Sequence, residues 1–136
     1  MAESGDQQRM ESHRVGRLAI FWHDREAPRE DDWNAALTLL SDVDLATLRV
    51  LVLTKGGAPT ATQRARLGQV VHGPVPVAVV SDHVGVRFVA STLALFMKRI
   101  KTFRTDELPA AYAHLDLSRA EASGADGFLA KFEAPG

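Results

Sequence analysis

Residues 48–72 read LRVLVLTKGGAPTATQRARLGQVVH, and this stretch decides the class of fold. It begins with an aliphatic run of the length of a buried strand, which two glycines and a proline then end. Thr60 and Gln63 have the spacing of a capping box, so a helix is predicted to start just after Thr60. A strand, a glycine-rich turn and a helix in this order are typical of α/β folds, where ligands and partners meet the carboxyl ends of the strands.

Similar patterns extend on both sides of this stretch. Short apolar runs predict two further strands, at 18–22 and 75–80, and a short edge strand at 100–103. Helical periodicity predicts three further helices, at 31–40, 84–99 and 106–115. The alternation predicts one α/β domain at 17–116, built on a single mixed or mainly parallel sheet of about four strands. The polar residues 1–16 are predicted to be a disordered tail, and residues 117–136 a partly frayed helical extension.

The composition is that of a globular protein, with 46% hydrophobic and 24% charged residues. The net charge of −1 argues against nucleic acid or an anionic membrane as the main partner, because the chain has no overall basic field. The lack of cysteine excludes disulfides, thiolate metal sites and cysteine nucleophiles.

The sequence also carries signals about the cellular location. No run approaches the roughly 18 apolar residues of a membrane span, and the N-terminus lacks the apolar centre of a signal peptide. Arginine makes up 12 of the 16 basic residues and alanine is abundant, as in proteins from GC-rich bacterial genomes. We therefore expect a bacterial, cytoplasmic protein without a transmembrane segment.

The segment Lys55-Gly56-Gly57 invites comparison with a phosphate-binding loop, because glycines allow close backbone approach and a helix N-terminus follows. The spacing of a Walker motif is absent, and the lysine precedes the glycines instead of opening the helix. A plain strand-to-helix turn is the better interpretation. A weaker anion site, with Thr60, Thr62 and Arg64 as its polar groups, stays open as an alternative.

Acidic and imidazole side chains occur in pairs that could serve catalysis or metal binding: His23-Asp24, Asp31-Asp32 and Asp82-His83. No third ligand has helical spacing, Asp82 is suited to cap the following helix, and Ser81 lacks the glycines of a nucleophile elbow. We therefore assign no catalytic residue, metal ligand or cofactor. A hidden enzymatic centre at Asp82 and His83 is kept as the least favoured hypothesis.

Two further stretches carry a family resemblance: VPVAVVSD at 75–82 and IKTFRTDELPAAYAHL at 100–115. They resemble the SpoIIAA-like branch of the STAS superfamily, in which a strand ending in Phe leads to a final helix of the pattern e-x-x-x-A-x-x-x-L. Phe103, Glu107, Ala111 and Leu115 match this pattern, and Asp32-Trp33 matches the start of the first helix of the family. The resemblance covers about residues 17–116 and rests mostly on core positions.

The resemblance implies a small α/β sandwich, with helices largely on one side of the sheet, that acts as a non-enzymatic regulatory or interaction module. Anti-sigma-factor antagonists of this superfamily carry a phosphorylated serine in an Asp-Ser-Ser/Ala-Gly motif after a central strand. The corresponding loop here, at 54–62, lacks that motif, and only Thr60 or Thr62 could replace the serine as phosphoacceptor. The SpoIIAA-like proteins also resemble lipid-binding CRAL-TRIO domains.

The leading functional hypothesis is contact with a protein partner through the strand, loop and helix at 54–64. The residues expected to form this contact are Lys55, Gly56, Gly57, Thr60, Thr62 and Arg64. The alternative is a small-ligand or lipid-binding domain that uses the apolar helix predicted at 84–99. That helix is apolar around more than half its circumference, which also favours a homodimer; Phe88, Leu95 and Phe96 are its candidate dimer or ligand surface.

Overall fold

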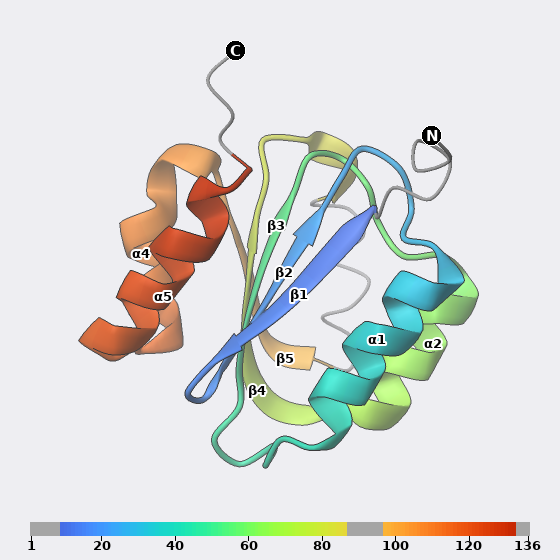
Figure 1. The fold of residues 1–136 in the computed structure, drawn as a ribbon, viewed down its shortest axis with the longest axis horizontal. Helices are drawn as coiled ribbons and strands as arrows, with labels where there is room; N and C mark the ends of the chain where they lie inside the picture. The colour runs from blue at the N-terminus through green and yellow to red at the C-terminus, as the bar shows by residue number, and fades with distance from the viewer. Residues whose placement is uncertain (1–8, 87–96, 133–136) are drawn as a thin grey trace.

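The computed structural model describes residues 9–86 and 97–132, which form one sheet with helices on both faces (Figure 1). The five strands follow each other in chain order across the sheet, and β1 is antiparallel to β2 whereas the other neighbours are parallel. The strands are β1 (Met10–Val15), β2 (Leu18–His23), β3 (Arg49–Thr54), β4 (Gly73–Val80) and β5 (Met97–Phe103).

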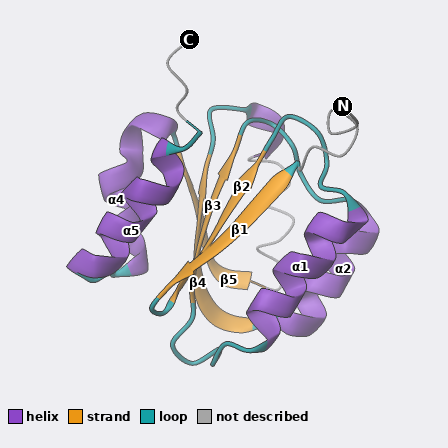
Figure 2. Ribbon diagram, in the orientation of Figure 1, coloured by secondary structure: helices purple, strands orange, loops and turns teal. Residues whose placement is uncertain are grey.

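The helices form two pairs that lie on opposite sides of the sheet (Figure 2). One pair is α1 (Glu30–Ser41) and α2 (Ala61–Val70). The other is α4 (Leu108–Leu115) and α5 (Arg119–Ala130), with the short 3-10 helix η2 (Thr105–Glu107) directly before α4. The prediction of an α/β fold with a mainly parallel sheet is therefore confirmed.

Both faces of the sheet are buried, because side chains alternate along each strand. On β2, Ala19 and Phe21 belong to the cluster that contains Trp33 of α1. Leu18 and Ile20 belong to a second cluster on the opposite face, which α4 and α5 cover. Parallel strands buried on both faces read as continuous aliphatic runs, and this explains the sequence of β3 and β4.

Two details of the predicted fold are wrong. The sheet has five strands instead of about four, because part of the predicted disordered tail is strand β1. Backbone pairing with β2 holds this polar edge strand, and Gly16, with φ +57°, forms the turn between them. The helices do not lie largely on one side, because the strands are apolar on both faces and each face needs cover.

The C-terminal region is more ordered than expected. Helix α5 has 12 residues, and Phe128 and Leu129 are buried against the sheet, so this helix belongs to the core. Its start carries a capping box formed by Ser118 and Glu121. That S-x-x-E spacing is readable in the sequence and was missed.

The predicted helix at 84–99 falls mostly outside the described residues. Residues 84–86 are helical, and residues 97–99 belong to β5, so the predicted edge strand is confirmed but begins three residues earlier than expected. The candidate surface residues Phe88, Leu95 and Phe96 lie outside the described part of the chain.

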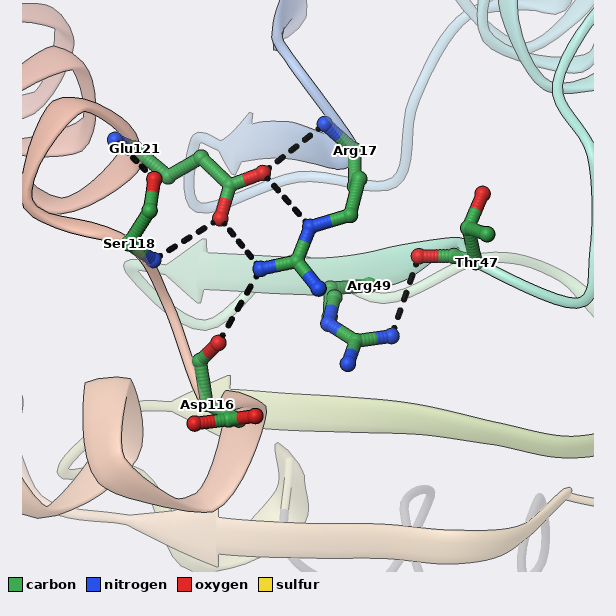
Figure 3. Close-up of polar contacts among 6 residues, drawn as sticks. All are labelled: Arg17, Thr47, Arg49, Asp116, Ser118 and Glu121. Carbon is green, nitrogen blue, oxygen red and sulfur yellow. Dashed lines mark hydrogen bonds and ion pairs between the residues drawn. The ribbon is translucent and has the colours of Figure 1, made fainter.

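An ion pair fastens α5 to the turn between β1 and β2 (Figure 3). The backbone N–H and the Nε of Arg17 donate to Glu121 Oε2 at 2.9 and 3.0 Å, and a terminal guanidinium nitrogen donates to Glu121 Oε1 at 2.7 Å. These hydrogen bonds from Arg17 lower the pKa of Glu121 to about 2, against a loss of solvation that acts in the opposite direction. The carboxylate also accepts from the N–H of Ser118, so one buried group caps α5 and binds the hairpin.

Glu121→Gln should lower the free energy of unfolding at pH 7 by about 2 kcal/mol. This is below the ~3–5 kcal/mol of a fully buried pair, because the Arg17 side chain is 38% exposed. The stability that this carboxylate contributes is complete above pH 4.5 and is lost as the pH falls toward 2. The free energies of unfolding of the wild type and Glu121→Gln should therefore converge in that range. Urea unfolding at several pH values measures this.

Asp106→Asn is the matched control, because it removes a carboxylate from an exposed ion pair with Arg104. It should cost no more than about 0.5 kcal/mol. Equal losses in the two variants would contradict a special role for Glu121.

Candidate functional site

The carboxyl ends of the four parallel strands meet at one edge of the sheet, at the top of the view in Figure 2. Backbone hydrogen bonds join the segments that leave this edge: the N–H of Lys55 donates to His23 O at 3.0 Å, and the N–H of Ser81 donates to Phe103 O at 2.9 Å. This edge contains the predicted contact loop and the residues of the Asp82-His83 pair. In parallel α/β sheets it is also the usual place for a ligand or partner site.

The loop after β3 is held in one conformation by hydrogen bonds at both of its ends. The hydroxyl of Thr54 donates to Gly57 O at 2.6 Å and accepts from the N–H of Gly56 at 3.1 Å. The N–H of Gly57 donates to Asp24 O at 2.8 Å, which ties this loop to the one after β2. Gly56 has φ +128°, a conformation that favours glycine.

Gly57 is required by the close approach of two backbones. A Cβ atom at this position would lie 2.2 Å from Glu26 O and 2.4 Å from Asp24 O. No side chain fits at these distances, so the second glycine of the Lys-Gly-Gly segment has a structural role.

The predicted capping box at the start of α2 is confirmed. The N–H of Gln63 donates to Thr60 Oγ1 at 3.2 Å, and the N–H of Thr60 donates to Gln63 Oε1 at 2.9 Å. Gln63 is 1% exposed, and its Nε2 also donates to Pro28 O and to Glu30 Oε2, both at 3.1 Å. Gln63 therefore fixes α2 to α1 as well, a role with no local signal in the sequence.

The predicted contact residues divide into two groups. Lys55, Thr60 and Thr62 are exposed on the loop and on the first turn of α2. Gly57 is buried, and Gly56 and Arg64 are half-buried; the guanidinium of Arg64 donates to Pro59 O at 3.0 Å. The exposed group can meet a partner, whereas the second group holds the loop in shape.

Among the described residues, Asp82 accepts no hydrogen bond from the helix that begins at 84, so the expected local cap is not seen there. Asp82 accepts from the N–H of Thr105 at 3.1 Å and from its hydroxyl at 2.7 Å, and these bonds lower the pKa of Asp82. The carboxylate therefore binds Thr105, the first residue of η2, after β5, and not the described turn of the helix that begins at 84. The local hydrogen bond is made by Ser81, whose hydroxyl accepts from the N–H of His83 at 3.2 Å.

An apolar cavity of about 90 Å³ lies on the side of the sheet that α1 and α2 cover. Its described lining includes side chains from both helices and from β2, β3 and β4, such as Phe21, Trp33, Val50, Leu67 and Val79. Gly57, Ala58 and Pro59 of the contact loop also line it. The cavity thus lies directly behind the loop that carries Lys55 and Thr62.

His23 belongs to the lining of this cavity and is 5% exposed. Burial lowers the pKa of its imidazole to about 4, and the nearby Asp32 carboxylate only partly offsets this, so the ring is neutral at pH 7. The Nδ1 atom is enclosed by protein and has no hydrogen-bond partner in the described chain. Sequence reasoning placed His23 in a loop, but the alternation of Ala19, Phe21 and His23 puts it on the apolar face of β2.

Within the described ranges, no three His, Asp or Glu side chains gather closely enough to hold a metal ion. None of the helices described is long and apolar enough to cross a membrane. Comparison with protein-family models, curated proteins and solved structures found no match to this chain.

Gly57→Ala should destabilise the fold by about 3 kcal/mol or more, because its Cβ would collide with two carbonyl oxygens. Gly127→Ala is the control: it lies in helix α5 with open space around it, so it should stabilise the protein by about 0.5–1 kcal/mol. Denaturant unfolding of both variants measures the difference. A Gly57→Ala protein as stable as the wild type would show that the two loops do not approach as described.

The buried imidazole makes stability depend on pH between 6.5 and about 4. A proton binds the unfolded chain at its ordinary pKa of 6.5, but the folded chain only near 4, so stability is complete above 6.5 and falls as the pH drops. The full loss from His23 is about 3 kcal/mol. Unfolding measured for the wild type and His23→Leu across this range should show the loss in the wild type alone. Parallel curves for the two proteins would contradict the burial of His23.

Proposed function

We propose that this chain is a non-enzymatic regulatory or interaction module of the STAS type, which binds a protein partner through the strand, loop and helix at 54–64. The observation that carries the proposal is the rigid presentation of this segment. Hydrogen bonds fix both ends of the loop, while Lys55, Thr60 and Thr62 remain exposed. A surface that is already ordered loses little conformational entropy on binding.

The charges of the segment favour an acidic partner surface. Lys55 is exposed, and the first turn of α2 contains no acidic residue that would neutralise the positive end of the helix dipole. Rim charges of this kind act mainly on association rate and on the choice of partner.

The geometry also distinguishes the two candidate phosphoacceptors. The hydroxyl of Thr60 is engaged in the capping box. Thr62 is exposed and lies two residues further along, in the first turn of α2. A phosphate at Thr62 would lie at a helix N-terminus, where negative charge is favourable. We infer that Thr62 is the better candidate for modification by a kinase.

The positions that carry the family resemblance support the STAS proposal, although helices cover both faces of the sheet and not largely one. Phe103, Ala111 and Leu115 are buried together on one face, and Asp32-Trp33 is buried at the start of α1. A non-enzymatic role agrees with Asp82, whose carboxylate is bound to Thr105.

Lys55→Glu should weaken capture of a protein partner about tenfold, because it places a negative charge against an acidic surface. The immobilised full-length chain is mixed with an extract of its native host, and a captured partner is then purified and titrated. The matched control is Asp42→Lys, a charge reversal at an exposed position where α1 ends, at the opposite edge of the sheet. A partner lost with Asp42→Lys but kept with Lys55→Glu would place the contact elsewhere.

The alternative function is binding of a small ligand or lipid. The apolar cavity beneath α1 and α2 is the observation that favours it, in place of the predicted apolar helix at 84–99.

A further inference from the structure

The cavity behind the contact loop combines an apolar wall with one polar group. Its volume of about 90 Å³ gives room for roughly six to nine water-sized groups, since each needs about 10–15 Å³. An apolar cavity of this kind is suited to a small organic molecule, or to the end of a larger one.

Among the described lining residues, the polar side-chain atoms are already paired, except for those of His23. The hydroxyl of Thr54 is used twice within the loop, and the indole N–H of Trp33 donates to Gln63 O at 3.1 Å. No hydrogen bond reaches either ring nitrogen of His23 in the part of the chain described here. A buried imidazole without partners costs free energy, so an occupant that pairs with it restores a lost interaction.

The two ring nitrogens of His23 differ in their surroundings. Nδ1 is enclosed by protein, whereas Nε2 is not among the enclosed atoms. An unpaired acceptor is tolerated more readily in a protein interior than an unpaired N–H group. The neutral ring therefore carries its proton on Nε2, where it can donate to an occupant.

The charge of the lining restricts the occupant further. The lining residues within the described ranges include no Lys, Arg, Asp or Glu. A carboxylate or phosphate would thus lose its hydration without gaining a counter-ion, which is costly. The described lining therefore favours a neutral occupant over a free fatty acid or a nucleotide.

We propose that the cavity is a binding site for a small neutral organic molecule, mainly apolar, with one carbonyl, ether or hydroxyl oxygen that accepts a hydrogen bond from His23 Nε2. Shape and apolar contact come from the α1, α2 and sheet side chains, and orientation comes from the imidazole. The site is independent of partner contact, because the exposed face of the loop does not line it.

The experiment titrates the full-length, 15N-labelled protein with 2-pentanone and follows the ring nitrogens by NMR at pH 7. The His23 signals are assigned by their loss in His23→Leu. Saturable shifts of the His23 nitrogens are expected, and His23→Leu should bind 2-pentanone about five- to tenfold more weakly, as for the loss of one hydrogen bond.

Two controls separate the parts of the proposal. Butyrate has nearly the same shape as 2-pentanone but carries a charge, so it should cause no saturable shift. Ala36→Leu fills the cavity beside α1 and should abolish binding while His23 is retained. If Ala36→Leu does not fold, the titrations of the wild type and of His23→Leu with 2-pentanone still test the proposal.

Three results would overturn the proposal. One is the absence of any saturable His23 shift up to the solubility limit of 2-pentanone, and another is equal affinity in the wild type and His23→Leu. The third is butyrate binding as tightly as 2-pentanone, which would show that a cation serves the site. The partner-capture experiment with Lys55→Glu does not affect the outcome of the 2-pentanone titration. The partner-contact proposal and the ligand-site proposal can therefore be disproved independently.

Discussion

Burial of both faces of strands β2, β3 and β4 is the constraint on which the rest of this structure depends. Strands with apolar side chains on both faces cannot leave a face in water, and each residue of β2 from Leu18 to Phe21 is at most 5% exposed. The fold therefore needs helices on two sides. The pair α1 and α2 comes from the crossovers between parallel strands, whereas the second layer comes from the C-terminal α4 and α5. The position of α5 is held by its buried Phe128 and Leu129 and by a specific tie, the buried carboxylate of Glu121 bound to Arg17.

The same constraint produces the candidate site. Parallel strands bring their carboxyl ends to one edge, so the loops after β2 and β3 must pass close to each other. Gly57 makes this close approach possible. Its N–H donates to Asp24 O, and it has no Cβ that would collide with the neighbouring backbone. Gln63 adds a second tie from α2 to Pro28. The result is a contact loop whose shape is set by buried backbone interactions, while its exposed side chains remain available to a partner.

The features that could be predicted from the sequence are those with a local physical cause. The aliphatic run of β3, the glycine turn and the capping box of Thr60 and Gln63 all depend on neighbouring residues, and the structure has each of them. Strand β1 was missed because MESHRV is polar and is held by pairing with β2. The bond from Asp82 to Thr105 and the burial of His23 were also missed, because they depend on segments far apart in the chain or on the face that a strand turns inward.

The strand, loop and helix at 48–72 serve two surfaces at once. Residues 57–59 line the cavity from one side, and Lys55 and Thr62 are exposed on the other. An occupant of the cavity could switch a partner site only if the loop had two arrangements with different affinities for it. Gly57 is clamped between the carbonyls of Asp24 and Glu26, and Thr54 closes the turn, so the described structure supports one arrangement. A bound molecule would then act by mass action, stabilising the folded loop and the sheet edge behind it, and partner affinity would change little.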